Sequence, residues 1–200
     1  MSVLLENMSM IGLNSFLALI PILFGWLMLK TRQPLLQVAF TLLWFSFLPN
    51  TLYILTDLRY LPEQWAAMHH FGKLALAVQY LMYELLGLSS FLLALYPLEK
   101  TLVLSHWREN KVLLPFVLIP VNFFVGFGMV LGRVQRLNSW DIFIDAPKVM
   151  HASFHIVSSS ELMLFVVLFG CFANALYFVF RKYRGVSVAL VSKTSKNSHV

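Results

Sequence analysis

Charge is scarce in this 200-residue chain: Asp, Glu, Lys and Arg together make up 12% of it, whereas hydrophobic residues make up 59%. A soluble domain is about 25% charged and roughly 45–50% apolar. The composition therefore excludes a soluble globular domain and a disordered chain. There is one cysteine, Cys171, so an internal disulfide and a disulfide-rich scaffold are excluded as well.

Motifs for nucleotide binding and for nucleophilic catalysis are also missing. The chain has no P-loop, no Gly-x-Gly-x-x-Gly, no Gly-x-Ser-x-Gly and no cluster of cysteine ligands. No cofactor is expected for this reason. The net charge of +6 does not indicate a nucleic-acid partner, because five of the 15 basic residues lie in the last 20 positions. A basic tail beside anionic lipid headgroups explains that distribution, and membrane lipids are the expected partners.

Long apolar runs are what the chain does have, and a membrane-spanning helix needs about 20 mostly apolar residues. The sequence predicts an all-α integral membrane protein: a bundle of about five transmembrane helices with short interfacial helices on the outer face. We expect a single transmembrane domain over residues 1–184 and a basic cytoplasmic tail without regular structure over residues 185–200. The predicted spans are Met10–Leu29, Leu35–Tyr53, Leu74–Tyr96, Val112–Leu131 and Glu161–Phe180.

The basic residues predict the orientation of the chain, because cytoplasmic loops carry an excess of Lys and Arg. With the N-terminus outside, the cytoplasmic segments hold ten basic residues and the outer segments hold five. Residues 1–9 contain no basic residue, which argues against a cleaved secretory signal. The simplest localisation is a bacterial inner membrane, with the N-terminus outside and the C-terminus in the cytoplasm.

This orientation places the two most polar segments, residues 54–73 and 132–160, on the outer face. Pro49 removes a backbone donor near the start of the first segment, so its helix end is predicted to be disturbed. Thr56 and Asp57 are typical cap residues for a short interfacial helix. One interpretation is a kinked and capped helix end. The other is a pocket wall in which Asn50, Tyr53 and Asp57 point inward.

The second polar segment begins with two arginines three residues apart, Arg133 and Arg136, which share one face of a helical turn. Two guanidinium groups on one face can bind a phosphate or a carboxylate, and they can equally pair with Asp57 and Asp141. We predict that Asp57 and the two arginines lie within reach of one another. Asn138 belongs to a turn signal and Trp140 suits the headgroup level of a membrane.

Two motifs stand at the starts of these polar segments: Pro49-Asn50 followed by Tyr53, Thr56, Asp57 and Leu58, and Gly132-Arg133 followed by Arg136 and Asn138-Ser139-Trp140-Asp141. With these motifs the chain resembles the DUF1361 family of bacterial membrane proteins. It covers most of the chain in length and in number of spans. It implies a small multi-pass membrane protein, and it implies no catalytic role for any residue.

Two other features of the sequence suggest chemistry. Glu84 lies about ten residues inside the third predicted span, where burial disfavours its charged form. It is either a neutral acid bonded to Tyr80 or Asn122, or a titratable group that relays protons or binds a ligand. His151 and His155 are four residues apart on one helical face, which is metal-ligand spacing. Hydrogen-bonding histidines at the interface are the alternative.

Three functions remain open from the sequence alone. The first is a binding or accessory protein whose outer pocket holds an anionic ligand or a lipid headgroup. The second is a membrane-embedded enzyme acting on a lipid or lipid-linked substrate, with Asp57 or Asp141 as general base. The third is a proton-coupled carrier of a small solute that uses Glu84. The first is favoured because no complete catalytic set is visible.

Overall fold

The chain folds into helices throughout the part that the computed structural model describes, which is residues 2–104 and 113–197, with side chains described for 4–102 and 114–182. No strand occurs within these ranges, so the predicted all-α fold class is confirmed. The elements are α1 Ser2–Lys30, α2 Pro34–Phe47, α3 Pro49–Tyr53, the 3-10 helix η1 Ile54–Tyr60, α4 Leu61–Ala66, α5 His70–Leu104, α6 Leu113–Arg133, α7 Asp141–Ile144, α8 Ala146–Ser158 and α9 Ser160–Asn197.

Five segments of the described chain are long and apolar enough to cross a membrane, which confirms the predicted number. They are Leu4–Lys30, Pro34–Ala66, His70–Leu102, Leu114–Arg133 and Ser160–Lys182. The second span is longer than the sequence predicted. Residues 54–66, which were expected to form most of an outer loop, instead continue α2 and α3 as η1 and α4. Asp57 can remain inside this span because its carboxylate is buried and accepts a hydrogen bond from the Tyr83 hydroxyl of α5.

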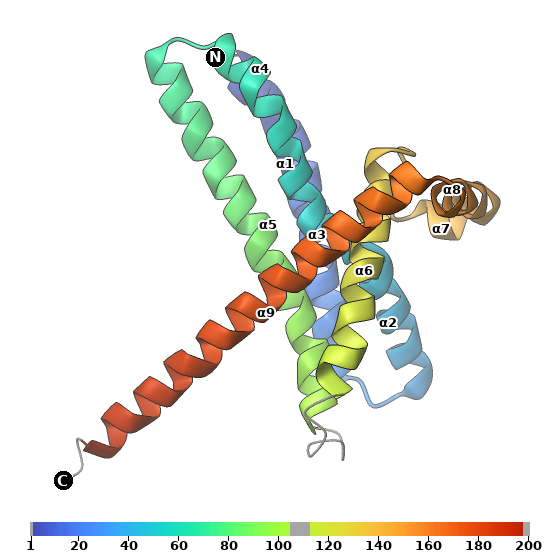
Figure 1. Cartoon of the computed structure of the whole chain (residues 1–200), viewed down its shortest axis with the longest axis vertical. Helices are drawn as coiled ribbons and strands as arrows, with labels where there is room; N and C mark the ends of the chain where they lie inside the picture. Colours follow the sequence, from blue (N-terminus) through green and yellow to red (C-terminus); the bar gives the residue numbers. More distant parts are fainter. Residues whose placement is uncertain (1, 105–112, 198–200) are drawn as a thin grey trace.

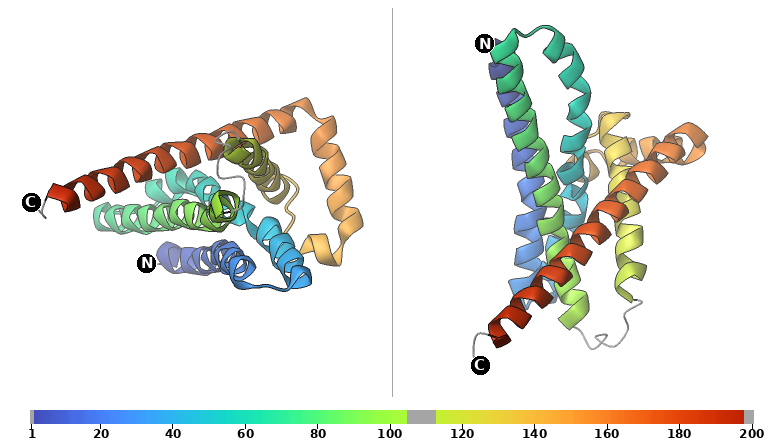
Figure 2. Two further views of the ribbon diagram at one scale, coloured as in Figure 1. Left: turned by 90° about the horizontal axis from the view of Figure 1, so that it is seen from below. Right: turned by 60° about the vertical axis from the view of Figure 1, so that its left-hand side comes forward.

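The helices alternate in direction, so the chain ends and connections collect at two opposite faces of the bundle (Figure 1). One face carries the N-terminus, the α4–α5 turn and the connection from α6 to α9, and we call it the N-terminal face. The other carries the α1–α2 turn and the C-terminus. α1, α2 and α5 pack side by side, whereas α9 packs mainly on α6 and crosses the bundle obliquely (Figure 2).

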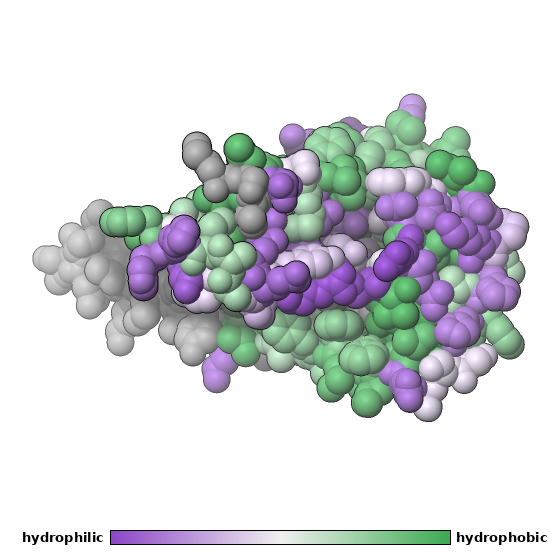
Figure 3. Space-filling view, turned by 90° about the horizontal axis from the view of Figure 1, so that it is seen from above, coloured by the Kyte–Doolittle hydropathy of each residue, from purple (hydrophilic) through white to green (hydrophobic). Residues whose placement is uncertain are grey.

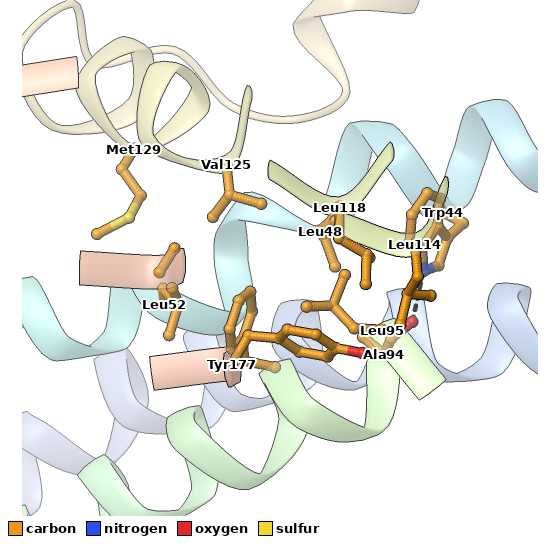
Figure 4. Close-up of a cluster of buried hydrophobic side chains, with 12 residues drawn as sticks. Trp44, Leu48, Leu52, Ala94, Leu95, Leu114, Leu118, Val125, Met129 and Tyr177 are labelled. Carbon is orange, nitrogen blue, oxygen red and sulfur yellow. Dashed lines mark hydrogen bonds between the residues drawn. The ribbon is translucent and has the colours of Figure 1, made fainter. Parts of the chain in front are cut away.

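A continuous apolar core joins these helices. Trp44 and Leu48 at the end of α2 meet Leu95 of α5, Leu118 of α6 and Tyr177 of α9, as Figure 4 shows. The indole nitrogen of Trp44 donates a hydrogen bond of 2.8 Å to the carbonyl oxygen of Ala94, so its single polar atom is satisfied inside the core. This cluster fixes α3 and the C-terminal half of α6 beside each other, and both contribute to the site described below.

α6 and α9 approach each other closely because both carry a glycine at their contact. A Cβ atom on Gly126 would lie 2.7 Å from the backbone nitrogen of Gly170 and 2.7 Å from the carbonyl oxygen of Val166. Small residues allow such backbone contact between membrane helices, where packing drives association. The close contact holds the C-terminal end of α6, including Arg133, in a fixed position relative to α9.

The connection between α6 and α9 contains the two short helices expected at this face. α8 lies across the direction of α1, α5 and α6 (Figure 2), and the carboxylate of its N-cap residue Asp145 accepts a hydrogen bond from the backbone N–H of Lys148. Ala152 and Ile156 are buried, whereas Met150 and Phe154 on another face are strongly exposed. A transverse helix with an exposed apolar face is typical of a membrane interface.

α9 continues as helix to Asn197 in the structure. Its backbone is therefore helical over part of the segment whose composition predicts a tail without regular structure. The boundary of the membrane domain at residue 184 stays a prediction.

Candidate functional site

A buried carboxylate, Asp57, lies at the centre of the polar residues on the N-terminal side of the bundle. Only 1% of Asp57 is exposed. Its Oδ1 accepts a hydrogen bond of 2.7 Å from the Arg133 guanidinium, and its Oδ2 accepts bonds of 2.9 Å from Asn14 and 2.9 Å from the Tyr83 hydroxyl. The carboxylate thus joins α1, η1, α5 and α6, and each of its oxygens has a partner, as a buried charge requires.

The 3-10 segment η1 brings these groups together. Thr56 precedes Asp57, and its hydroxyl donates a bond of 2.6 Å to the carbonyl oxygen of Tyr53. The same hydroxyl accepts a bond from Arg133, so one guanidinium contacts two consecutive side chains of η1. Arg133 is the last residue of α6, and its charge is favourable at the negative end of the helix dipole.

An aromatic ring supports the same guanidinium. The Arg133 side chain lies over the Tyr53 ring, with 4.6 Å between its Cζ and the ring centroid. This cation–π contact fixes the plane of the guanidinium while Asp57 neutralises its charge. The Nε atom of Arg133 is buried and has no hydrogen-bond partner among the residues that the structure describes, which is unusual for a buried donor.

A cavity of about 420 Å³ opens beside this cluster. Its walls come from α1, the α2–α3 junction, η1, α6, the α6–α7 connection, α7 and α8. We call it the polar pocket. Its polar lining residues are Asn14, Ser46, Asn50, Tyr53, Arg59, Tyr60, Arg133, Arg136, Asn138 and Ser139. Viewed onto the N-terminal face, hydrophilic side chains form a band across the centre and over the end with α7 and α8, and apolar side chains lie to either side (Figure 3).

The charge of the polar pocket is positive. Three arginines line it, Arg59, Arg133 and Arg136, and no Asp, Glu or Lys from the described part of the chain does. Arg133 is neutralised by Asp57. Arg59 donates a hydrogen bond to the Tyr60 hydroxyl, and neither Arg59 nor Arg136 forms an ion pair with any residue in the described ranges. Two cationic side chains therefore line the cavity without a compensating carboxylate.

The connection after α6 places Arg136 and the residues that follow it. Arg136 has a backbone φ of 54°, in the left-handed region that residues other than glycine rarely adopt. The chain reverses there, and the backbone N–H of Asn138 donates a bond of 2.8 Å to the Asp141 carboxylate. Asn50 of α3 donates a bond of 2.6 Å to the hydroxyl of Ser139, so the connection is tied to α3 across the pocket.

The sequence profile of a family described as "Protein of unknown function (DUF1361)" matches residues 13–176. The chain belongs to the DUF1361 family. The matched range includes every residue that lines the polar pocket. No curated protein and no solved structure is significantly similar to the chain. Together with its five apolar helices, the family assignment makes this DUF1361 chain a multi-pass integral membrane protein.

The structure brings most of the residues predicted for the site into one place. Asn50, Tyr53, Arg133, Arg136 and Asn138 line the polar pocket. The predicted contact of Asp57 with Arg133 is confirmed, whereas Arg136 makes no ion pair with Asp57. Asp57 lies beneath the pocket and does not line it.

Trp140 and Asp141, also predicted for the site, are not among the lining residues either. The Asp141 carboxylate accepts the backbone bond from Asn138 and so stabilises the connection that follows α6. A role for any of these residues in ligand binding stays a prediction.

The two histidines predicted as metal ligands lie on α8, away from the pocket lining. The side-chain amide nitrogen of Gln135 donates a hydrogen bond of 3.0 Å to Nδ1 of His155. Within the described ranges, no group of three His, Cys, Asp or Glu residues is placed to hold a metal ion. His151 and His155 therefore have no third ligand of this kind nearby in that part of the chain.

Glu84 has neither of the partners that the sequence suggested. Its Oε1 is buried, and no residue of the ranges with described side chains forms a hydrogen bond with it. The Tyr80 hydroxyl donates to Gln64 at 3.2 Å, and the Asn122 amide donates to Asn174 at 3.0 Å. Both predicted partners donate instead to polar side chains of other helices, Gln64 of α4 and Asn174 of α9. Glu84 does not line the polar pocket.

Sequence reasoning missed Asn14 and Tyr83, which both donate hydrogen bonds to the carboxylate of Asp57. Asn14 carried a usable signal, because an amide inside an apolar span needs a hydrogen-bond partner in the protein. Tyr83 carried none, since tyrosine is common in membrane helices and the residue beside it, Glu84, is the more unusual one.

Proposed function

We propose that this DUF1361 protein is a binding or accessory protein that holds an anionic ligand or a lipid headgroup in the polar pocket. The observation that carries the proposal is the pair of uncompensated arginines, Arg59 and Arg136, in a cavity that no carboxylate lines. An anion between them would supply the missing counter-charge. Arginine is suited to this task because its planar fork of donors matches carboxylate and phosphate oxygens.

The remaining polar groups of the pocket suit an anion as well. The Ser139 hydroxyl accepts a bond from Asn50, which leaves its own hydrogen available for donation. Asn138 is exposed at the pocket and contributes a further amide. Together with the guanidinium groups of Arg59 and Arg136, these donors favour an oxygen-rich ligand.

The level of the pocket along the bundle supports a membrane ligand. α6 is 21 residues long, which is about 30 Å at 1.5 Å per residue and matches the hydrocarbon thickness of a bilayer. Arg133 ends α6, and α8 lies across the bundle on the same side (Figure 2). An amphipathic transverse helix lies at the headgroup boundary. The arginines of the pocket are then at the depth of lipid phosphates.

The same geometry argues against Asp57 as a general base. A general base must be within hydrogen-bond reach of the proton that it removes. Asp57 is buried and accepts bonds from three side chains, Asn14, Tyr83 and Arg133. Its carboxylate serves to hold Arg133 and to join four segments, and binding is the simpler function of the pocket.

The basic residues support the proposed placement in the cell. α1, α5 and α9 all run toward the face opposite the pocket (Figure 1), and their C-terminal parts, with the α1–α2 turn, carry Lys30, Arg32, Lys100, Arg181 and Lys182. If that face is cytoplasmic, as the excess of basic residues favours, the polar pocket opens to the outer side of a bacterial inner membrane.

Thermal unfolding of the purified full-length protein in detergent tests the proposal. Phosphatidylglycerol should raise the unfolding temperature by several degrees more than phosphatidylcholine with the same acyl chains, because a ligand of the folded state stabilises it. Arg136→Gln should abolish most of that difference. Arg32→Gln removes an exposed arginine from the opposite face and should leave it unchanged. Equal shifts with both lipids, or equal effects of the two substitutions, would refute the proposal.

A further inference from the structure

We infer that the polar pocket takes a phosphate monoester carried on an apolar chain, with the phosphate between Arg59 and Arg136 and the chain leaving between α1 and α7. The inference rests on the proposed function and names the class of its ligand. It combines the charge of the pocket with the chemistry of its outer walls.

The charge of the pocket favours an anion with more than one negative charge. Once Asp57 has neutralised Arg133, Arg59 and Arg136 leave a charge of two to be balanced. A phosphate monoester carries about −1.5 to −2 at neutral pH. A phosphodiester or a single carboxylate carries one negative charge and would leave one arginine without a counter-ion.

The outer walls of the pocket are apolar. Leu13 and Leu17 come from α1, and Ile142 and Val149 come from α7 and α8. Leu13 is 54% exposed and Ile142 is 47% exposed. The acyl chain of a lipid whose headgroup lies in the pocket would contact these side chains, whereas a soluble phosphate ester would make no such contact. The pocket thus places two solvent-accessible arginines beside apolar side chains, which suits an amphiphile with an anionic head.

The two helices on either side of this exit are not closely packed on each other. α1 packs on α2, α3, α5 and η1, α7 packs on α8, and within the described ranges neither α7 nor α8 packs extensively on α1. The apolar surface continues from Ile142 over the exposed Phe143 and Ile144 at the end of α7. A ligand chain that leaves between α1 and α7 would therefore remain in contact with apolar side chains as it enters the bilayer.

The test measures binding to the full-length protein in detergent by native mass spectrometry with phosphatidic acid, phosphatidylglycerol, glycerol 3-phosphate and inorganic phosphate. The two lipids have identical acyl chains, so they differ in headgroup charge. We expect phosphatidic acid to bind about tenfold or more tightly than phosphatidylglycerol, and both soluble phosphates to bind more weakly still. Arg59→Gln and Arg136→Gln should each lower the affinity for phosphatidic acid about tenfold, and Arg32→Gln should not.

A second pair of variants tests the apolar walls. Leu13→Asn and Ile142→Asn should weaken binding of phosphatidic acid without changing the weak binding of glycerol 3-phosphate.

The wild-type comparison of ligands does not depend on any variant folding. Equal affinity for the two lipids would overturn the preference for a monoester, and glycerol 3-phosphate binding as tightly as phosphatidic acid would overturn the apolar chain. Either result leaves the proposed function intact if Arg136→Gln still weakens binding. Binding that depends on neither arginine would overturn both.

Discussion

Arg133 and Asp57 form an ion pair of 2.7 Å that connects the end of α6 to the 3-10 turn in the second span. The pair is largely buried, and a buried charge left without its partner is costly. The two residues are 76 positions apart in the sequence, so their contact fixes how α6 packs against α3 and η1.

We predict strong coupling between these two residues. Asp57→Ala and Arg133→Ala should each destabilise the protein, and the double variant should lose less than the sum of the two, by about 1–3 kcal/mol. Thermal unfolding in detergent measures the three effects. Arg136→Ala serves as the control, because Arg136 makes no ion pair with Asp57 and its effect should add to that of Asp57→Ala. Additive losses for Asp57 and Arg133 would mean that the pair contributes nothing.

A second prediction concerns glycine substitutions at and away from the contact of α6 with α3. A Cβ atom on Gly128 would lie 2.7 Å from Cβ of Pro49, whose ring cannot move aside. Gly128→Ala should therefore cost about 1–3 kcal/mol of stability. Gly12 of α1 has nothing within 4 Å of the corresponding position, so Gly12→Ala should stabilise by up to about 1 kcal/mol through helix propensity. Equal unfolding temperatures for the two variants would contradict the packing of α3 on α6.

The backbone of Arg136 allows its charge and its conformation to be separated. At φ 54° a side chain costs about 1–2 kcal/mol that glycine does not. Arg136→Gly should therefore be more stable than Arg136→Ala, although glycine normally lowers stability relative to alanine. Both variants should lose the stabilisation by phosphatidylglycerol to the same extent, since both remove the guanidinium. A less stable glycine variant would show that residue 136 is not in the left-handed region.

The orientation of the chain can be tested by labelling. In a Cys171→Ser background, Leu5→Cys and Ser195→Cys each introduce one thiol near an end of the chain. A membrane-impermeant reagent added to intact cells should label position 5 and not position 195, because the excess of basic residues places the C-terminal end inside. Labelling of position 195 alone would move the polar pocket to the cytoplasmic side.

The sequence was sufficient for the fold class and the number of spans, because both follow from the lengths of apolar runs. It was not sufficient for the course of the second span. Thr56 and Asp57 were predicted to cap a short interfacial helix outside the second span, yet the structure buries Asp57 and continues the span through both residues. Hydropathy reports how polar a segment is, and it does not report whether partners on other helices satisfy its polar groups.

The candidate site was predictable only in part, because the sequence does not show where α6 ends. Spacing placed Arg133 and Arg136 on one helical face, and a pairing of both with Asp57 followed from that assumption. The helix instead ends at Arg133, and the chain reverses at Arg136. The first arginine therefore points to Asp57 and the second lines the pocket. A helix end set by a left-handed residue other than glycine leaves no clear mark in the sequence.

Retention of lipid through purification tests the central claim most directly. Full-length wild type, the double variant Arg59→Gln/Arg136→Gln and the matched variant Lys30→Gln/Arg32→Gln are purified identically from one host membrane, and their bound lipids are identified by native mass spectrometry. Each double variant removes two positive charges, and only the first removes them from the pocket. We predict that wild type and Lys30→Gln/Arg32→Gln retain an anionic lipid that Arg59→Gln/Arg136→Gln has lost. The same retained lipids on all three proteins would contradict an anion-binding pocket.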